Sequence, residues 1–355
     1  MSAPTVSDVW SERDTTPSRC EAALRDLITR AHSESEAVVP ARVLNLVVIV
    51  DAEFRGEIEN RLERVGRYHP SRLIVCAVRS GQKTLDARAT MAAEAPHGAG
   101  ALSVAREHIE IDIGPQQLKT LDSIVDPLVV TDLATVVWAP HGHEEGVDAL
   151  RRLAQVVLID SLDEPELQVA LCRADELAQD LYVVDLAWLR STPWRERVAA
   201  AFDPPAFRAG LADISAVTVR HREDSAAAGM LFAGWLASRL GWRPARLTYG
   251  RGEWRGRLRA RRGEVSLRLH ACEKQSAPGL DGVTVETASG TAVSLDRGPG
   301  GLRTARRKRD GTEQAWTVLG ASRGESGILG EGVRQALLRD PTYAPALAAA
   351  RTMVG

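Results

Sequence analysis

The 355-residue sequence lacks the features that mark membrane proteins, secreted proteins and disulfide-stabilised proteins. It contains no run of about 18 apolar residues, and its first residues, MSAPTVSDVWSERD, lack the basic and then apolar order of a signal peptide. The four cysteines (Cys20, Cys76, Cys172 and Cys272) are widely spaced and form no C-x-x-C pair, which argues against a disulfide framework or a zinc site. We therefore expect a cytoplasmic protein with reduced thiols and no membrane partner.

The sequence also lacks an excess of charge of either sign. Its formal net charge is -2 and its isoelectric point is near 6.5, so composition indicates no strongly basic face for a nucleic-acid backbone. We expect no nucleic-acid partner. Almost all of the positive charge is arginine, and this alone is given no functional weight. The length and a hydrophobic content of 44% predict about two domains.

The common catalytic signatures are missing as well. The sequence contains no G-x-x-x-x-G-K-[ST] loop, no G-x-G-x-x-G after the first apolar run, no G-x-S-x-G elbow and no H-E-x-x-H helix. The first apolar run leads instead into AEFRGEIEN, whose single glycine does not allow a backbone to close on a pyrophosphate. We therefore expect no dinucleotide cofactor.

Hydrophobic patterning predicts an α/β organisation over the first 160 residues. ARVLNLVVIVD and RLIVCAV are apolar runs typical of strands covered on both faces, and FRGEIENRLERV between them has the pattern of a helix, which favours a parallel β-α-β unit. TLDARATMAAEA and LSVAREHIEIDI alternate apolar and polar residues, as an antiparallel hairpin does. The first sheet is therefore predicted to be mixed.

The second half has a different pattern. The helix SAAAGMLFAGWLASRL, with Asp224 or Ser225 as its cap, is predicted to stop at Gly241. Short alternating segments from ARLTYG to QAWTVL then predict an antiparallel β-meander. We predict an α/β N-terminal domain with a mixed sheet over residues 1–163, followed by an α+β C-terminal domain with an antiparallel β-meander over residues 164–355.

Two clusters of polar residues have simple structural interpretations. His141 and His143, with adjacent glutamates in APHGHEEG, offer too few ligands for zinc, so a loop before a helix is favoured and no metal site is predicted. The segment GPGGLRTARRKRDG (298–311) carries five basic side chains, which fit either a solvated hairpin or a contact with phosphate or an acidic partner.

Histidine and arginine also gather where predicted elements meet. His69 and Arg72 lie in RYHPSR, and His221 and Arg222 lie in VRHREDS before a helix N-terminus, where an anion is favoured. These four residues are candidates for binding an anion. A structural turn at the first segment and a salt-bridged helix start at the second are the alternatives.

The segment LAWLRSTPWRERVAAAFDPP (186–205) is unusual in a chain with only 5% aromatic residues. Thr192 and Pro193 predict a helix start, and the apolar stripe beginning at Trp194 leaves Arg195 and Arg197 pointing away from it. Tryptophan and arginine are enriched at protein interfaces. The alternative is that the tryptophans anchor the domain core.

Several segments together resemble a known family. RVGRYHPSR, IEIDIGP, DPLVVTDLATVVWAPHGH, VVLIDSLDEPEL, DLAWLRSTPWRERVAAAFDPP and VRHREDSAAAGMLFAGWLASRLGW closely resemble the glucose-6-phosphate dehydrogenase assembly protein family, OpcA, of actinobacteria and cyanobacteria. The likeness is strong over residues 40–245 and weaker over the first residues and the basic 298–311 segment.

The resemblance implies a non-catalytic protein without a cofactor, whose partner is glucose-6-phosphate dehydrogenase. It would promote the active oligomer of that enzyme, or activate it allosterically, in the oxidative pentose phosphate pathway. The best-defined motif of the resemblance then becomes the predicted partner-binding surface: Trp188, Arg190, Trp194, Arg195 and Arg197. The alternative function is a sugar-phosphate sensor or enzyme, with the anion-binding candidates lining a pocket between the domains.

Overall fold

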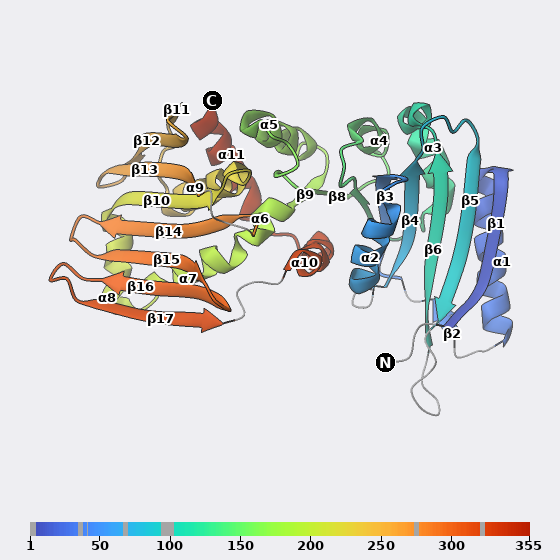
Figure 1. Ribbon diagram of the computed structural model, residues 1–355, viewed down its shortest axis with the longest axis horizontal. Coiled ribbons are helices and arrows are strands. Elements are labelled where there is room, and N and C mark those ends of the chain that lie inside the picture. The colour runs from blue at the N-terminus through green and yellow to red at the C-terminus, as the bar shows by residue number, and fades with distance from the viewer. Residues whose placement is uncertain are drawn as a thin grey trace. The chain divides into compact units, whose positions relative to one another are not determined.

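The computed structural model describes residues 5–34, 38–40, 42–66, 70–93, 103–272, 277–319 and 324–355. The chain forms two compact units and passes between them more than once (Figure 1). Unit 1 comprises Met1–Ile159, Asp180–Val184 and Leu329–Leu337, and unit 2 comprises Asp160–Gln179, Asp185–Ile328 and Leu338–Gly355. The division into residues 1–163 and 164–355 stays a prediction. None of the described helices is both long and apolar enough to cross a bilayer.

Unit 1 is built on a nine-stranded mixed sheet, which confirms the predicted fold class. The order is β1-β5-β6-β4-β3-β7-β8-β9, with β2 paired to β6. Strands β6, β4, β3, β7 and β8 run parallel, whereas β5 is antiparallel to both β1 and β6. The strand bounds are β1 (Thr5–Thr15), β2 (Val38–Pro40), β3 (Leu44–Asp51), β4 (Ser71–Val78), β5 (Leu85–Ala93), β6 (Ser103–Ile113), β7 (Thr135–Trp138), β8 (Val156–Ile159) and β9 (Tyr182–Asp185).

The helices of unit 1 explain why its central strands are so apolar. All but the last residue of β3 are buried, as expected for a strand covered on both faces. Helix α1 packs against β1 and β5, with Leu24 and Leu27 buried on one face. The helices are α1 (Pro17–Glu34), α2 (Arg55–Gly66), α3 (Leu121–Val125), α4 (Glu144–Ala149) and most of α10 (Gly324–Leu338), with the 3-10 turns η1 (Pro115–Thr120) and η2 (Asp126–Leu128).

Unit 2 contains an eight-stranded sheet in the order β11-β12-β13-β10-β14-β15-β16-β17. Its strands are β10 (Ile214–Arg222), β11 (Thr248–Gly250), β12 (Glu253–Ala260), β13 (Gly263–Cys272), β14 (Leu280–Thr287), β15 (Ala292–Gly298), β16 (Gly301–Arg307) and β17 (Glu313–Leu319). The pairs are antiparallel except β10 with β13. The predicted meander is therefore interrupted by β10, because the connection through helix α9 returns to the sheet as a parallel crossover.

Helices cover one face of this sheet. On β13 the residues Val265, Leu267 and Leu269 are buried, whereas the alternate residues Ser266 and Arg268 are exposed. Helix α9 (Ala226–Leu240) lies against β10 and β13 and ends at Gly241 in a left-handed conformation, as predicted. The other helices of unit 2 are α5 (Leu167–Leu177), α6 (Leu186–Arg190), α7 (Thr192–Phe202), α8 (Pro205–Arg208) and α11 (Tyr343–Val354), with the 3-10 turn η3 (Ala209–Asp213).

Gly234 lies where α9 packs closely on α11, and this gives a stability prediction. A Cβ added at Gly234 would lie 2.2 Å from the Ala346 carbonyl oxygen and 3.1 Å from the Ala350 nitrogen. These are backbone atoms, so Gly234→Ala must push the helices apart. We expect urea denaturation to show a free energy of unfolding lower by about 1–3 kcal/mol.

The control for this prediction is Gly330→Ala in α10, where an added Cβ meets no atom within 4 Å. Alanine has the higher helix propensity, so this variant should unfold at an unchanged or slightly higher urea concentration. Equal free energies of unfolding for the two variants would show that the close approach of α9 and α11 does not require glycine at position 234.

Candidate functional site

The segment that carries the strongest resemblance folds into the interior of unit 2. Trp188 on α6 and Trp194 on α7 are only 2% and 1% exposed. The helix starts at Thr192, next to Pro193, and ends at Phe202 before the two prolines, much as the sequence predicts. The two tryptophans thus occupy the core, which was the alternative interpretation, and the proposed contact of this segment with a partner stays a prediction.

Arg195 does not point away from the core, so that part of the prediction is wrong. Its guanidinium carbon lies 3.4 Å from the centre of the Trp188 ring, and its side chain is only 9% exposed. Nη2 donates to the Thr192 hydroxyl at 2.8 Å, and Nη1 lies 3.6 Å from Oδ2 of Asp340. Burial, only partly offset by the charge of Asp340, lowers the pKa of Arg195 to about 10.

Asp340 holds this arrangement together from a distant part of the chain. Its Oδ2 accepts a hydrogen bond from Nε1 of Trp188 at 2.9 Å, and its Oδ1 accepts one from the Thr342 backbone at 2.8 Å. Burial alone would raise the pKa of Asp340, but these bonds and the Arg195 charge outweigh it and lower the pKa. The result is a charged network built around an indole ring.

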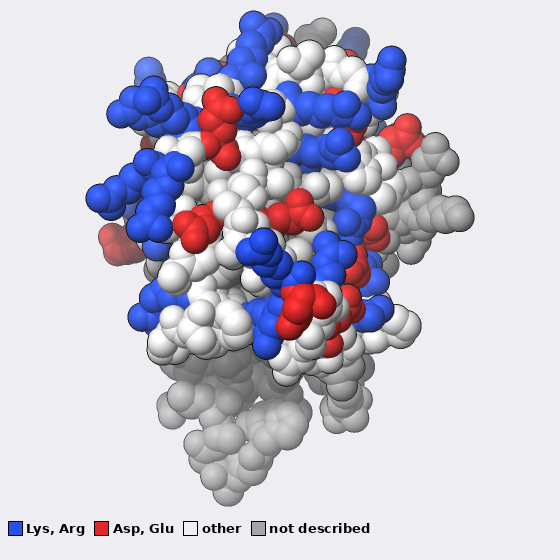
Figure 2. Space-filling model, turned by 90° about the vertical axis from the view of Figure 1, so that its left-hand side faces the viewer, with Lys and Arg blue, Asp and Glu red and all other residues white. Residues whose placement is uncertain are grey.

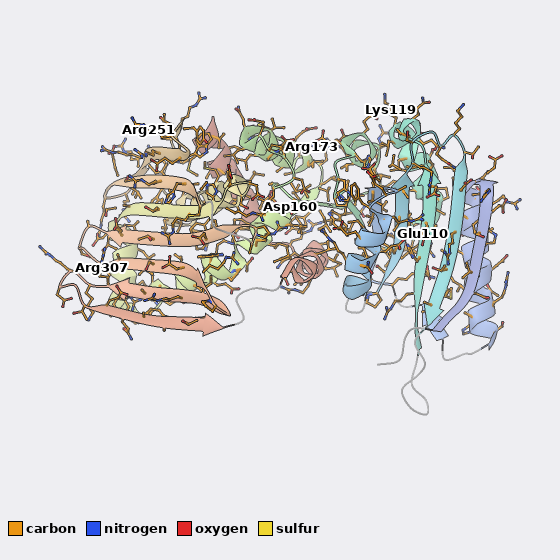
Figure 3. All side chains as sticks on the ribbon, viewed as in Figure 1. Glu110, Lys119, Asp160, Arg173, Arg251 and Arg307 are labelled. Carbon is orange, nitrogen blue, oxygen red and sulfur yellow. The ribbon has the colours of Figure 1, made fainter. Side chains whose placement is uncertain are left out.

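Arg190 forms a second buried ion pair. Nη1 and Nη2 bind the two carboxylate oxygens of Asp160 at 2.8 and 2.7 Å (Asp160 is labelled in Figure 3). The two side chains are 9% and 11% exposed, so this fork is a bidentate pair largely removed from water. Arg197 is the most exposed arginine of the segment, at 25%, and it forms an ion pair with the adjacent Glu196.

Asp185 lies near Asp160, the acidic member of the second ion pair. Its carboxylate is fully buried and accepts hydrogen bonds from the Ser161 backbone and hydroxyl, from the Ala187 backbone and from the Tyr343 hydroxyl. Burial, and then the nearby charge of Asp160, raise the pKa of Asp185 to about 6. Three chain segments thus meet at one carboxyl group.

The four anion-binding candidates are not brought together within either unit. Arg72, in unit 1, binds Oε2 of Glu107 at 2.7 Å and the Leu128 carbonyl at 2.8 Å. In unit 2, Arg222 is paired with Asp224, and Nδ1 of His221 lies 2.7 Å from the Arg222 carbonyl oxygen. His69 lies outside the described residues. The guanidinium groups of Arg72 and Arg222 therefore already have carboxylate partners, and the anion-binding role stays a prediction.

The histidines of the APHGHEEG loop have structural roles. His143 begins α4 in a left-handed conformation, with Nε2 3.1 Å from Oδ1 of Asp51. His141 packs its ring on Phe54 with centroids 4.5 Å apart. These contacts agree with the loop that the sequence favoured.

Sequence reasoning missed a charged cluster on the sheet of unit 1. Glu59 of α2 meets His108 and Glu110 of β6, and one ligand atom from each lies within 4.8 Å of the others (Glu110 is labelled in Figure 3). This donor set suits a divalent cation. Arg55 is 3.8 Å from both carboxylates, however, and already supplies positive charge. Only the alternation of His108 and Glu110 along β6 could have signalled it.

Sequence reasoning also missed an open groove in unit 2. It has a volume of about 1310 Å³ and lies among β10–β13, the start of α5 and the end of α11. Its lining includes the rings of Tyr249 and Trp254, which contact each other in a tilted arrangement with centroids 5.0 Å apart, and charged side chains of both signs. His221 also lines it, and burial lowers the pKa of this histidine. The groove thus combines charges of both signs with the exposed ring of Tyr249.

The chain thus combines a mixed α/β sheet in unit 1 with a mostly antiparallel sheet and its covering helices in unit 2. Residues 62–176 match the family described as the glucose-6-phosphate dehydrogenase subunit N-terminal domain, and residues 181–347 match its C-terminal domain. The chain belongs to this family, the OpcA family, as the resemblance implied.

Curated relatives agree with this assignment. The "Putative OxPP cycle protein OpcA" of Synechococcus elongatus is 24% identical over 212 residues, which are 58% of this chain and 47% of the relative. The protein of the same name from Nostoc punctiforme is 32% identical over 142 residues, which are 39% of this chain and 30% of the relative. The matched segments thus span less than half the length of these relatives. The family is tied by these names to the oxidative pentose phosphate cycle.

Solved structures align with this chain only at low TM-scores and low sequence identity. The scyllo-inositol dehydrogenase of Lactobacillus casei aligns over 88% of this chain and 96% of its own with a TM-score of 0.43 and 10% identity. A structure titled as a "putative oxidoreductase" from Parabacteroides merdae aligns over 89% and 96% with a TM-score of 0.49 and 9% identity. These scores carry no argument about activity.

Proposed function

We propose that this chain is a non-catalytic factor that binds glucose-6-phosphate dehydrogenase and promotes its active oligomer. The observation that carries the proposal is the match of both halves of the chain to a family described as a subunit of that dehydrogenase. The absence of the common catalytic motifs from the sequence supports a role without chemistry of its own.

Such a factor acts by binding one state of its partner better than another. An activator that binds the assembled, active dehydrogenase more tightly than the inactive enzyme shifts the population toward the active state. Equal affinity for both states would produce a complex but no activation. The coupling is reciprocal, so conditions that favour the active enzyme should also tighten the complex.

The segment 186–205, which contains Trp188 and Trp194, has an indirect role in this proposal. Because Trp188 and Trp194 are buried, they would fix the shape of unit 2 rather than touch the partner. Arg197 is the most exposed of the five residues first assigned to partner binding. We propose it as the member of this segment that reaches a partner directly.

The proposal predicts activation on mixing. The rate of NADP reduction by the cognate glucose-6-phosphate dehydrogenase should rise and saturate as this chain is titrated in, and the two proteins should co-elute on size exclusion. Another NADP-reducing dehydrogenase serves as the control and should show neither effect. If neither rate nor elution changes over varied substrate and redox conditions, the proposed function is wrong.

A further inference from the structure

Unit 2 carries a dense group of arginines, which we call the arginine edge. Between residues 239 and 268 there are ten arginines and only two acidic residues, Glu253 and Glu264, in a chain whose net charge is -2. All ten arginines are exposed. They are Arg239, Arg243, Arg246, Arg251, Arg255, Arg257, Arg259, Arg261, Arg262 and Arg268.

The fold collects most of these residues at one edge of the eight-stranded sheet. Strand β11 is the last strand at that edge, followed by β12 and β13. Arg255, Arg257 and Arg259 alternate along β12, so their side chains leave the same face at intervals of about 7 Å. Arg268 of β13 stands opposite Arg255. In Figure 2, Lys and Arg outnumber Asp and Glu over the upper half, the level at which β11–β13 lie in Figure 1.

Most of this charge is not neutralised by the described part of the chain. Four of the arginines take part in ion pairs, with Glu253, Glu264 and Asp213 as their partners. The other six form no ion pair with a described residue: Arg239, Arg243, Arg246, Arg251, Arg259 and Arg261. Like charges held this close repel one another, and an acidic partner would relieve that repulsion.

An aromatic pair with one exposed ring lies within the arginine edge. Tyr249 on β11 is 62% exposed, and its ring contacts that of Trp254 of β12 in a tilted arrangement with centroids 5.0 Å apart. All three residues of β11 are exposed. Tyrosine and arginine together are typical of the few residues that dominate binding energy at protein interfaces.

We propose that the arginine edge is the surface on which this chain docks an acidic face of its partner dehydrogenase, with Tyr249 as the apolar anchor. The inference rests on the proposed function and adds to it the surface and the charge of the partner. A protein partner is favoured over a nucleic acid because the adjoining groove is also lined by Glu166, Glu223 and Glu253. These carboxylates would repel a continuous phosphate backbone, but they can pair with basic residues on a protein surface of mixed charge.

The test is a triple charge reversal in the full-length chain, Arg251→Glu, Arg259→Glu and Arg261→Glu. None of the three arginines has an ion-pair partner among the described residues, so the variant should fold normally, which its thermal melting checks. Affinity for the cognate dehydrogenase, measured by surface plasmon resonance at 50 mM salt, should fall roughly 10- to 100-fold, with the larger part in the association rate. Wild-type affinity should weaken at 300 mM salt.

A matched control reverses Arg307, Lys308 and Arg309 to glutamate, none of which has an ion-pair partner among the described residues. These exposed residues belong to β16 and the turn after it, near the opposite edge of the same sheet (Arg251 and Arg307 are labelled in Figure 3). Both variants change the net charge by the same amount. A loss of affinity confined to the first variant would therefore identify the arginine edge as the docking surface and exclude general charge repulsion. The control should change affinity by less than roughly threefold.

The outcomes separate the two proposals. If the wild-type chain binds and activates the dehydrogenase and the first variant does so equally well, the docking surface is wrong and the proposed function stands. If the wild-type chain neither binds nor activates, the proposed function fails and this inference fails with it. If a fluorescent oligothymidine binds the edge and the first variant loses only that binding, the edge serves a nucleic acid and the inference is overturned.

Discussion

Replacing Trp188 by alanine should lower the free energy of unfolding by about 3–5 kcal/mol, as measured by urea denaturation. The ring is 2% exposed, packs edge-on against Tyr343 with centroids 5.6 Å apart, and lies under the guanidinium of Arg195. The substitution leaves a cavity and removes the indole donor to Asp340. If the variant is as stable as the wild type, the contacts around the Trp188 ring do not stabilise the fold.

Arg197→Ala is the matched control for this substitution. Its side chain is 25% exposed and its ion pair is with the neighbouring Glu196, so we expect less than about 1 kcal/mol of destabilisation. The comparison matters for mapping the interface. If Trp188→Ala loses dehydrogenase binding, the cause is damage to the fold of unit 2. If Arg197→Ala keeps its stability and loses binding, Arg197 contacts the dehydrogenase directly.

Wild-type stability should fall as pH rises through the range in which Asp185 titrates. Burial and the charge of Asp160 raise the pKa of Asp185 from 3.8 to about 6, so between these values the folded state binds more protons than the unfolded state. The stabilising effect of this carboxyl is therefore present below pH 3.8 and lost by about pH 6. A difference of roughly two pKa units corresponds to about 3 kcal/mol.

The variant Asp185→Asn isolates this effect because an amide does not titrate. It retains an oxygen that can accept the hydrogen bonds from the Ser161 and Ala187 backbones. Urea denaturation of both proteins from pH 4 to pH 7 should show the wild type losing about 3 kcal/mol relative to the variant. Parallel pH curves for the two proteins would show that Asp185 does not titrate as its burial implies.

The segment 186–205 shows which features local sequence patterns predict and which they do not. The sequence predicted the helix from Thr192 to Phe202, because Pro193, the apolar spacing and the two following prolines are local signals. It placed Arg195 on the outside because helical spacing shows only which residues share a face. The residue that draws Arg195 inward is Asp340, which also binds Trp188 across 152 positions of sequence.

The arginine edge shows a second limit of prediction from sequence alone. Its alternation along EWRGRLRARR is visible in the sequence, yet arginine content alone did not distinguish a binding surface from base composition. The order of the strands brings β11, β12 and β13 to one edge, and that order follows from β10 entering the sheet beside β13. Strand order depends on pairing between distant segments, which a period-two pattern cannot specify.

The sequence by itself determined the family, the mixed sheet of the first half and the mostly antiparallel sheet of the second. These follow from motif identity and from alternation between buried and exposed positions, both of which are local properties. Only the tertiary structure decided that Trp188 and Trp194 are buried, that Asp185 shares its environment with Asp160, and that the arginines form one surface. Burial and charge pairing arise between residues far apart in the chain, so they exist only once the units have folded.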